Sequence, residues 1–185
     1  MMLKNSLPLL SDIRGGVLAR LLQDHRSSLA CVELLEQQLS DSGSTPRNAA
    51  LAVKLVEQLI DSPDDFHHMT ERRLFRHLWR RLGVFLPRYI DLDELHDERR
   101  ERRIDVIRFV DRSAAAFLED GEFRDALAAL CLCVRSQTEI EERCFFPLLR
   151  RHLTADDWSL AEDEMEAYNA AWLSIRGGER ETLTV

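Results

Sequence analysis

Histidine and glutamate side chains interrupt otherwise apolar helical patterns at several places in this 185-residue sequence. His67 and Glu71 are four residues apart, the spacing that puts two side chains on one helical face where they can chelate one ion. Imidazole and carboxylate ligands together suit iron, manganese or zinc. The polar positions on the apolar stripes are His25, His67, Glu71, His96, Gln137 and Glu141, with Arg99 and Arg103 nearby.

These polar positions are expected to meet in one layer of the fold. They fall early in the first and third predicted long helices and late in the second and fourth, and those ends lie at one level when neighbouring helices are antiparallel. Buried histidines and carboxylates are costly unless they are paired or bound to a metal. His68 is expected to point away from the layer, because adjacent side chains of a helix diverge. Taken singly, His25 could also be a core histidine that is hydrogen-bonded, and His96 could also lie on a solvated face of its helix.

Long segments with the period of an α-helix account for most of the chain. The pattern predicts helices over residues 17–39, 91–119, 122–153 and 155–172, and over 46–61 and 66–82, which form either one helix kinked at Pro63 or two helices. Thr45-Pro46, Gly83 and Asp120-Gly121 mark ends, and Thr154 with Asp157 forms a capping box. No segment alternates like a strand. The sequence therefore predicts an all-α fold, an antiparallel up-down four-helix bundle with a short fifth C-terminal helix.

The same pattern divides the chain into four parts. We expect an N-terminal extension over 1–16, the bundle over 17–153, a C-terminal helix over 154–176 and a flexible tail over 177–185.

Composition excludes several classes of function. The net charge of −8 leaves no basic excess for binding nucleic acid. No apolar run approaches the ~20 residues of a transmembrane helix. The four cysteines, Cys31, Cys131, Cys133 and Cys144, form no CxxC pair, which favours reduced thiols in a cytoplasmic protein.

Several segments, taken in order, resemble the hemerythrin-like (HHE cation-binding) family, bacterial type. Gln23-Asp24-His25-Arg26 resembles the motif of its first helix, and the stretch from Phe66 to Phe75 resembles the aromatic-His-His-Pro-Lys-Glu motif of its second. The stretch Glu94–Glu98 is similar to its third-helix Glu-His motif. The stretch Glu139–Leu148 is similar to its fourth-helix motif, which ends in Phe-Phe-Pro-Leu, and Leu153–Trp158 resembles a common bacterial tail. Order and spacing together make the match specific.

The resemblance implies a four-helix bundle that holds a non-heme, usually di-iron centre. Carried over by position, the implied ligands are His25, His67, Glu71, His96 and Glu141. The last histidine of the family falls on Gln137, and an amide oxygen is a weak, neutral replacement for imidazole.

Other positions also depart from the family, which usually has aliphatic residues where Arg99 and Arg103 stand. Either this run is a solvated face, or an arginine neutralises Glu71 or Glu141 in place of metal. Cys144, one turn beyond Glu141, is expected to be a core cysteine, with a soft extra ligand or a redox-sensitive thiol as the alternative.

Three functions follow from these expectations. The first is a metal module, with mono- or dinuclear non-heme iron, that binds or senses oxygen, nitric oxide, iron or redox state. The alternative is an interaction or regulatory protein with this fold that has lost its metal centre, holds no cofactor and acts on a protein partner. The third is an enzyme of iron–sulfur repair under oxidative stress. It is disfavoured because such relatives carry a cysteine-containing N-terminal piece, whereas no cysteine here precedes Cys31. No other catalytic motif is present.

Overall fold

The computed structural model describes residues 16–40, 46–61, 64–83, 90–109 and 120–182. All regular secondary structure within these ranges is helical, which confirms the all-α class. The elements are α1 (Val17–Ser40), α2 (Pro46–Asp61), α3 (Asp64–Leu82), α4 (Leu92–Ile107), α6 (Gly121–Ile140), the π-helical turn η3 (Glu141–Phe145), α7 (Phe146–His152) and α8 (Ala155–Thr182). None of the helices in this part of the chain has the length and apolar character needed to cross a bilayer.

Side-chain caps fix several helix starts. The Asp91 carboxylate accepts from the Glu94 amide at the start of α4, and Asp120 accepts from the amides of the first turn of α6. Thr154 and Asp157 form the predicted capping box of α8: the Thr154 amide donates to Asp157 Oδ2 at 2.9 Å, and the Asp157 amide donates to Thr154 Oγ1 at 3.3 Å. Each cap satisfies backbone donors that the first helical turn leaves unpaired.

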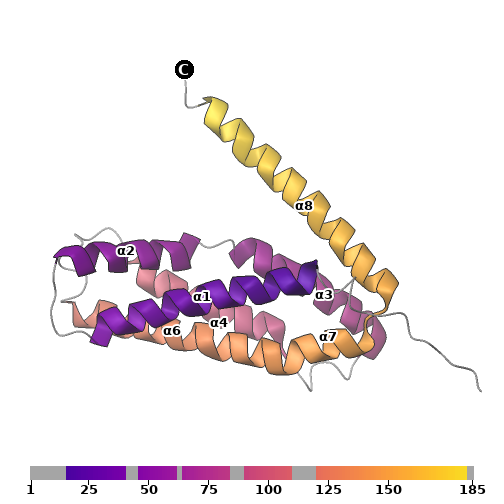
Figure 1. Cartoon of the computed structure of the whole chain (residues 1–185), viewed down its shortest axis with the longest axis horizontal. Helices are drawn as coiled ribbons and strands as arrows, with labels where there is room; N and C mark the ends of the chain where they lie inside the picture. Colours follow the sequence, from indigo (N-terminus) through magenta and orange to yellow (C-terminus); the bar gives the residue numbers. More distant parts are fainter. Residues whose placement is uncertain (1–15, 41–45, 62–63, 84–89, 110–119, 183–185) are drawn as a thin grey trace, which may run out of the picture.

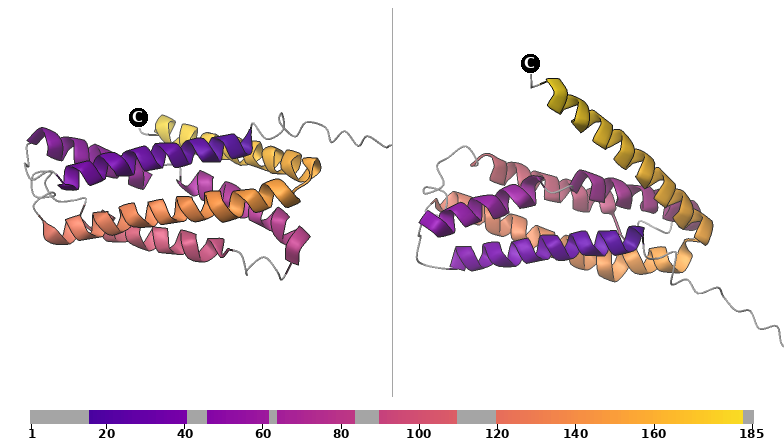
Figure 2. Two further views of the ribbon diagram at one scale, coloured as in Figure 1. Left: turned by 60° about the horizontal axis from the view of Figure 1, so that its bottom comes forward. Right: turned by 45° about the horizontal axis from the view of Figure 1, so that its top comes forward.

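Apart from α8, the helices form rows that pack side by side, with α2 followed by α3 and α6 followed by α7 along the same direction (Figures 1 and 2). Helix α6 packs against both α1 and α4, α2 packs along α1, and α3 contacts α4, α7 and α8. Helix α8 starts against α3 and then diverges from the other helices (Figure 1). The site described below lies where α1, α3, α4 and α6 come together.

Two apolar clusters occupy the core, and the polar layer lies between them. On α1, Leu18 and Leu21 belong to the first cluster, and Val32 and Leu35 to the second. His25 lies between these two pairs in the sequence and is also buried. On α4 the polar positions separate the two clusters in the same order, and on the stretch α6–η3 they separate them in the reverse order along the chain. The layer is therefore enclosed by apolar packing at both ends.

Some predicted boundaries are wrong. The continuous helix predicted from 91 is interrupted: α4 ends at Ile107, and the Phe109 amide donates to the Val106 carbonyl oxygen in a tighter i→i−3 turn. Residues 110–119 lie outside the described residues, as do 62–63, at the predicted break between α2 and α3, and 1–15 of the predicted extension.

Helix α8 is longer than the predicted 154–176. It continues through Gly177 and Gly178 to Thr182, into the predicted tail. Each glycine costs only about 1 kcal/mol in a helix, and Glu179, Arg180 and Glu181 beyond them favour helix formation.

Candidate metal centre

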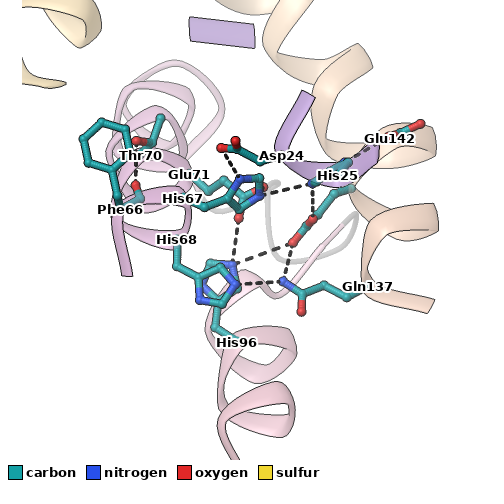
Figure 3. Close-up of polar contacts among 11 residues, drawn as sticks. Asp24, His25, Phe66, His67, His68, Thr70, Glu71, His96, Gln137 and Glu142 are labelled. Atoms are coloured by element: carbon teal, nitrogen blue, oxygen red, sulfur yellow. Dashed lines mark hydrogen bonds and ion pairs between the residues drawn. The ribbon is translucent and has the colours of Figure 1, made fainter. Parts of the chain in front are cut away.

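The six predicted polar side chains lie together in one buried layer (Figure 3). Four elements position them: α1 carries His25, α3 carries His67 and Glu71, α4 carries His96, and α6 with the first residue of η3 carries Gln137 and Glu141. Each residue is at most 5% exposed. The layer expected from the stripes therefore exists in this structure.

One group of four could hold a metal ion. His25, His67, Glu71 and Glu141 each offer one ligand atom, and these atoms all lie within 4.8 Å of one another. His25 Nε2 lies 3.1 Å from both His67 Nε2 and Glu141 Oε2, and His67 Nε2 lies 3.3 Å from Glu71 Oε1. Two imidazole nitrogens and two carboxylate oxygens thus converge from three directions on one point, a donor set that suits iron, manganese or zinc.

A second group shares Glu71 with the first. It consists of His68, Glu71 and His96. His96 Nε2 lies 3.0 Å from Glu71 Oε2, while Glu71 Oε1 faces His67. Glu141 spans the two groups in the same way, with Oε2 near His25 and Oε1 3.7 Å from His96 Nε2. Glu71 is therefore a residue that would contribute to holding an ion in either group, and Glu141 lies close to histidines of both.

The expected direction of His68 is wrong. Its ring stacks on His96 with centroids 4.0 Å apart, and Gln137 Nε2 lies 3.4 Å from its Nε2 (Figure 3). Adjacent helical side chains diverge by only about 100°. Both members of the His67-His68 pair can therefore flank a wide site that extends across the face of α3.

Two further acidic residues orient the histidines, and the sequence reasoning missed them. His25 Nδ1 donates to Glu142 Oε1 at 2.9 Å, and His67 Nδ1 donates to Asp24 Oδ2 at 3.3 Å. A metal-binding histidine typically donates its other ring N–H in this way, which turns the lone pair of Nε2 toward the ion. Their positions in the sequence could have indicated this role, because Asp24 directly precedes His25 and Glu142 directly follows Glu141.

Two buried acceptor atoms in the layer lack a hydrogen-bond partner among the described residues. They are Oε1 of Glu71 and Oε1 of Gln137. The Gln137 amide instead donates to Glu141 Oε1 at 2.7 Å. An unsatisfied buried acceptor costs about 1–3 kcal/mol. Glu71 Oε1 faces His67 Nε2 at 3.3 Å, and a cation bound by Glu71 and the neighbouring histidines would satisfy this oxygen, so the residues fit a metal.

Burial and close charges shift the pKa values in the layer. Burial by itself would raise the pKa of Glu71, but the facing His67 and His96 hold it well below its usual value. Burial opposes the charged forms of both His67 and His96, yet Glu71 and Asp24 raise the pKa of His67 to about 10, and Glu141 and Glu71 raise the pKa of His96. Without metal, protonated imidazoles thus balance the carboxylates, and metal binding would release their protons.

The stability of the metal-free protein should therefore depend on pH in two directions. The depressed pKa of Glu71 contributes stability above its unfolded value of 4.5, and this is lost as pH falls through the folded value. The raised pKa of His67 contributes stability that is full below its unfolded value of 6.5 and is lost as pH rises toward about 10. Urea melts across this range should show falling stability at both ends. His67→Gln should flatten the alkaline fall, and the matched His152→Gln variant should retain it; equal slopes in all three proteins would refute this balance of charge.

Arg99 is buried beside the layer, so the solvated-face interpretation is wrong at this position. It is 4% exposed and lies on the same stripe of α4 as Leu92, His96 and Val106, as the predicted helical phase requires. The burial of His68, followed by the positive charges of His96 and Arg99, lowers the pKa of His68 to about 2. Arg103 is partly buried and donates to the Ile60 carbonyl oxygen.

Cys144 is exposed, so the expectation of a core cysteine is wrong. It also lies outside both His/Glu groups. The physical reason is the π turn: Glu141 and Phe145 are both buried, and because a π turn holds more residues than an α turn, position 144 does not reach their face. The buried thiols are Cys31, Cys131 and Cys133, and burial raises the pKa of each.

Comparisons with protein-family models, curated proteins and solved structures give no match to this chain. The hemerythrin-like assignment therefore stays a prediction that rests on the sequence motifs.

Proposed function

We propose that this protein is a hemerythrin-like module that binds non-heme metal, with iron as the leading candidate, and that it binds or senses oxygen, nitric oxide, iron or redox state. The observation that carries this proposal is the convergence of His25, His67, Glu71 and Glu141 within 4.8 Å in a buried layer. Bound iron would supply redox chemistry and affinity for diatomic ligands. The chain supplies the ligands, holds the ring orientations through Asp24 and Glu142, and surrounds the ion with apolar packing.

The proposed architecture is the antiparallel up-down four-helix bundle with a fifth helix. In this assignment α1 is the first helix, α2 and α3 together form the second, α4 is the third, the stretch α6–η3–α7 is the fourth and α8 is the fifth. The packing of α6 against α1 and α4 and of α2 along α1 supports it.

We propose two ion positions, one at each His/Glu group. Glu71 contributes to both positions. His68 adds an imidazole to the second, and this compensates for Gln137, which stands where the family pattern has a histidine. The second position has fewer strong ligands and a partly buried histidine, so it should bind more weakly.

Metal analysis of the protein from iron-supplemented cells tests this proposal. We expect up to two ions per chain, and His68→Ala should lose the weaker one while the first stays bound. His152→Ala serves as the matched control, because His152 lies at the end of α7, outside both groups. Absence of bound iron, manganese and zinc from the wild-type protein would refute the proposal. An equal metal content in His68→Ala and wild type would refute the second position.

The alternative is a protein of the same fold that has lost its metal centre and acts through a protein partner. One observation favours it: in the metal-free layer Glu141 is already paired with His25 and Gln137, and Glu71 with His96, while Arg99 adds a buried positive charge. The same metal analysis separates the two functions.

A further inference from the structure

A pocket of about 300 Å³ lies between α3, α4 and α8, directly beside the second His/Glu group. His68 and His96 form part of its lining, and Tyr168 of α8 contributes from the opposite side. The volume is at the lower end of the range for small-molecule sites. The pocket therefore joins the second metal position to a space that a small molecule can occupy.

Positive charge dominates the rest of the lining. Arg72, Arg100 and Arg103 face the pocket, against a single carboxylate from Asp97. Guanidinium groups bind carboxylate and phosphate oxygens through paired hydrogen bonds. This lining is consequently selective for an anion.

Among the described residues, two of these arginines are paired in exposed ion pairs. Arg72 Nε lies 3.2 Å from Asp93 Oδ1, and Arg100 lies 3.1 Å from Asp97 Oδ1. The arginine side chains are 45% and 68% exposed. Exposed pairs of this kind contribute little to stability, so an incoming oxyanion can replace the aspartate partners at small cost.

His96 provides a second, independent observation. It lines the pocket and is 4% exposed, and its Nδ1 has no hydrogen-bond partner in the described part of the chain. His25 and His67, by contrast, donate their Nδ1–H groups to carboxylates. A histidine that binds metal through Nε2 ordinarily donates its other ring N–H to a carboxylate, carbonyl or water. The polar environment of His96 is thus incomplete beside this pocket.

We propose that the pocket binds a small organic anion whose carboxylate or phosphate oxygens contact Arg72, Arg100 and Arg103 next to the metal position of His68, Glu71 and His96. This inference rests on the proposed function, because an ion at the second position offsets the negative charge of Glu71, which lies behind the pocket-lining residues His68 and His96. An anion bound in this pocket would lie between the second metal position and Tyr168 of α8.

Isothermal titration of metal-loaded protein with succinate, and separately with inorganic phosphate, tests this proposal and distinguishes the two oxyanions. At least one of them should bind to wild type. The Arg72→Met/Arg100→Met double variant should bind it about tenfold more weakly or worse, the loss expected from removing charge-assisted hydrogen bonds. The matched control is Arg102→Met/Arg143→Met, two exposed arginines outside the pocket lining, which should leave affinity within about twofold.

Metal content, measured on every preparation, separates this inference from the proposed function. If metal binds but neither oxyanion does, or if both double variants lose affinity equally, the pocket assignment is overturned. If the protein retains no metal, the proposed function fails, and the same titrations on the metal-free protein still decide whether the pocket arginines bind the anion.

Discussion

Glu71→Gln should remove metal from both positions at once. Glu71 is fully buried and directs Oε1 toward His67 and Oε2 toward His96, so a single carboxylate serves both His/Glu groups. An amide keeps the shape but has one neutral oxygen and an NH₂ donor, which a cation repels. Because even residues that only orient a ligand cost 10–100-fold in metal affinity when they are changed, we expect a loss of more than about 100-fold. Competition against a chelator measures it.

Glu139→Gln is the matched control for this variant, since Glu139 is exposed on α6 and pairs with Arg143 one turn later. It should retain wild-type affinity. The metal-free Glu71→Gln protein should also be less stable by about 3 kcal/mol at neutral pH, because His67 and His96 lose their buried counter-charge. Glu71→Asp keeps the negative charge on a shorter side chain, which holds it farther from the histidines. Relative to Glu71→Gln, it should therefore restore much of the stability but little of the metal affinity. Metal retention by a folded Glu71→Gln protein would contradict the role of Glu71 in both groups.

Gln137→His should strengthen the second position. Gln137 is buried next to His68 and Glu141, and its amide is the weakest donor in the layer. An imidazole at this position offers iron a nitrogen lone pair in place of a neutral amide oxygen. In equilibrium competition against a chelator we expect the second ion to be bound at least about tenfold more tightly, which corresponds to about 1.4 kcal/mol.

The control for this gain is Ser136→His, which adds a histidine to the exposed side of the same turn of α6. It should leave retention unchanged. If neither Gln137→His nor His67→Ala changes the metal content, the layer is not a metal site. That result would favour the alternative function, a protein of this fold without a metal centre.

The sequence predicts the composition of the layer because each of its members interrupts an apolar stripe. His25 between Leu21 and Leu29, or His96 and Arg99 between Leu92 and Val106, is visible from the 3.6-residue period alone. The same period also predicts correctly which face of α4 is buried, although the charged run around Arg99 is typical of a solvated face.

Local irregularities could not be predicted in the same way. The π turn of η3 changes which face position 144 occupies, and nothing in the pattern around Glu141 indicates it. The orientation of His68 depends on how far the site extends toward α4, which is a property of tertiary packing. The early end of α4 at Ile107 depends on backbone bonds that a continuing apolar pattern conceals.

The position of the layer between the two apolar clusters has a consequence for the order of assembly during synthesis. The bond from His25 to Glu142 joins residues 117 positions apart, so the layer does not exist until the ribosome has released most of the chain. The apolar clusters at either end of the layer contain no ligand residue of either group. A nascent or truncated chain that ends before Glu141 keeps His68, Glu71 and His96 but lacks one ligand of the first group, so a metal ion bound by the first group would mark the chains that have completed folding.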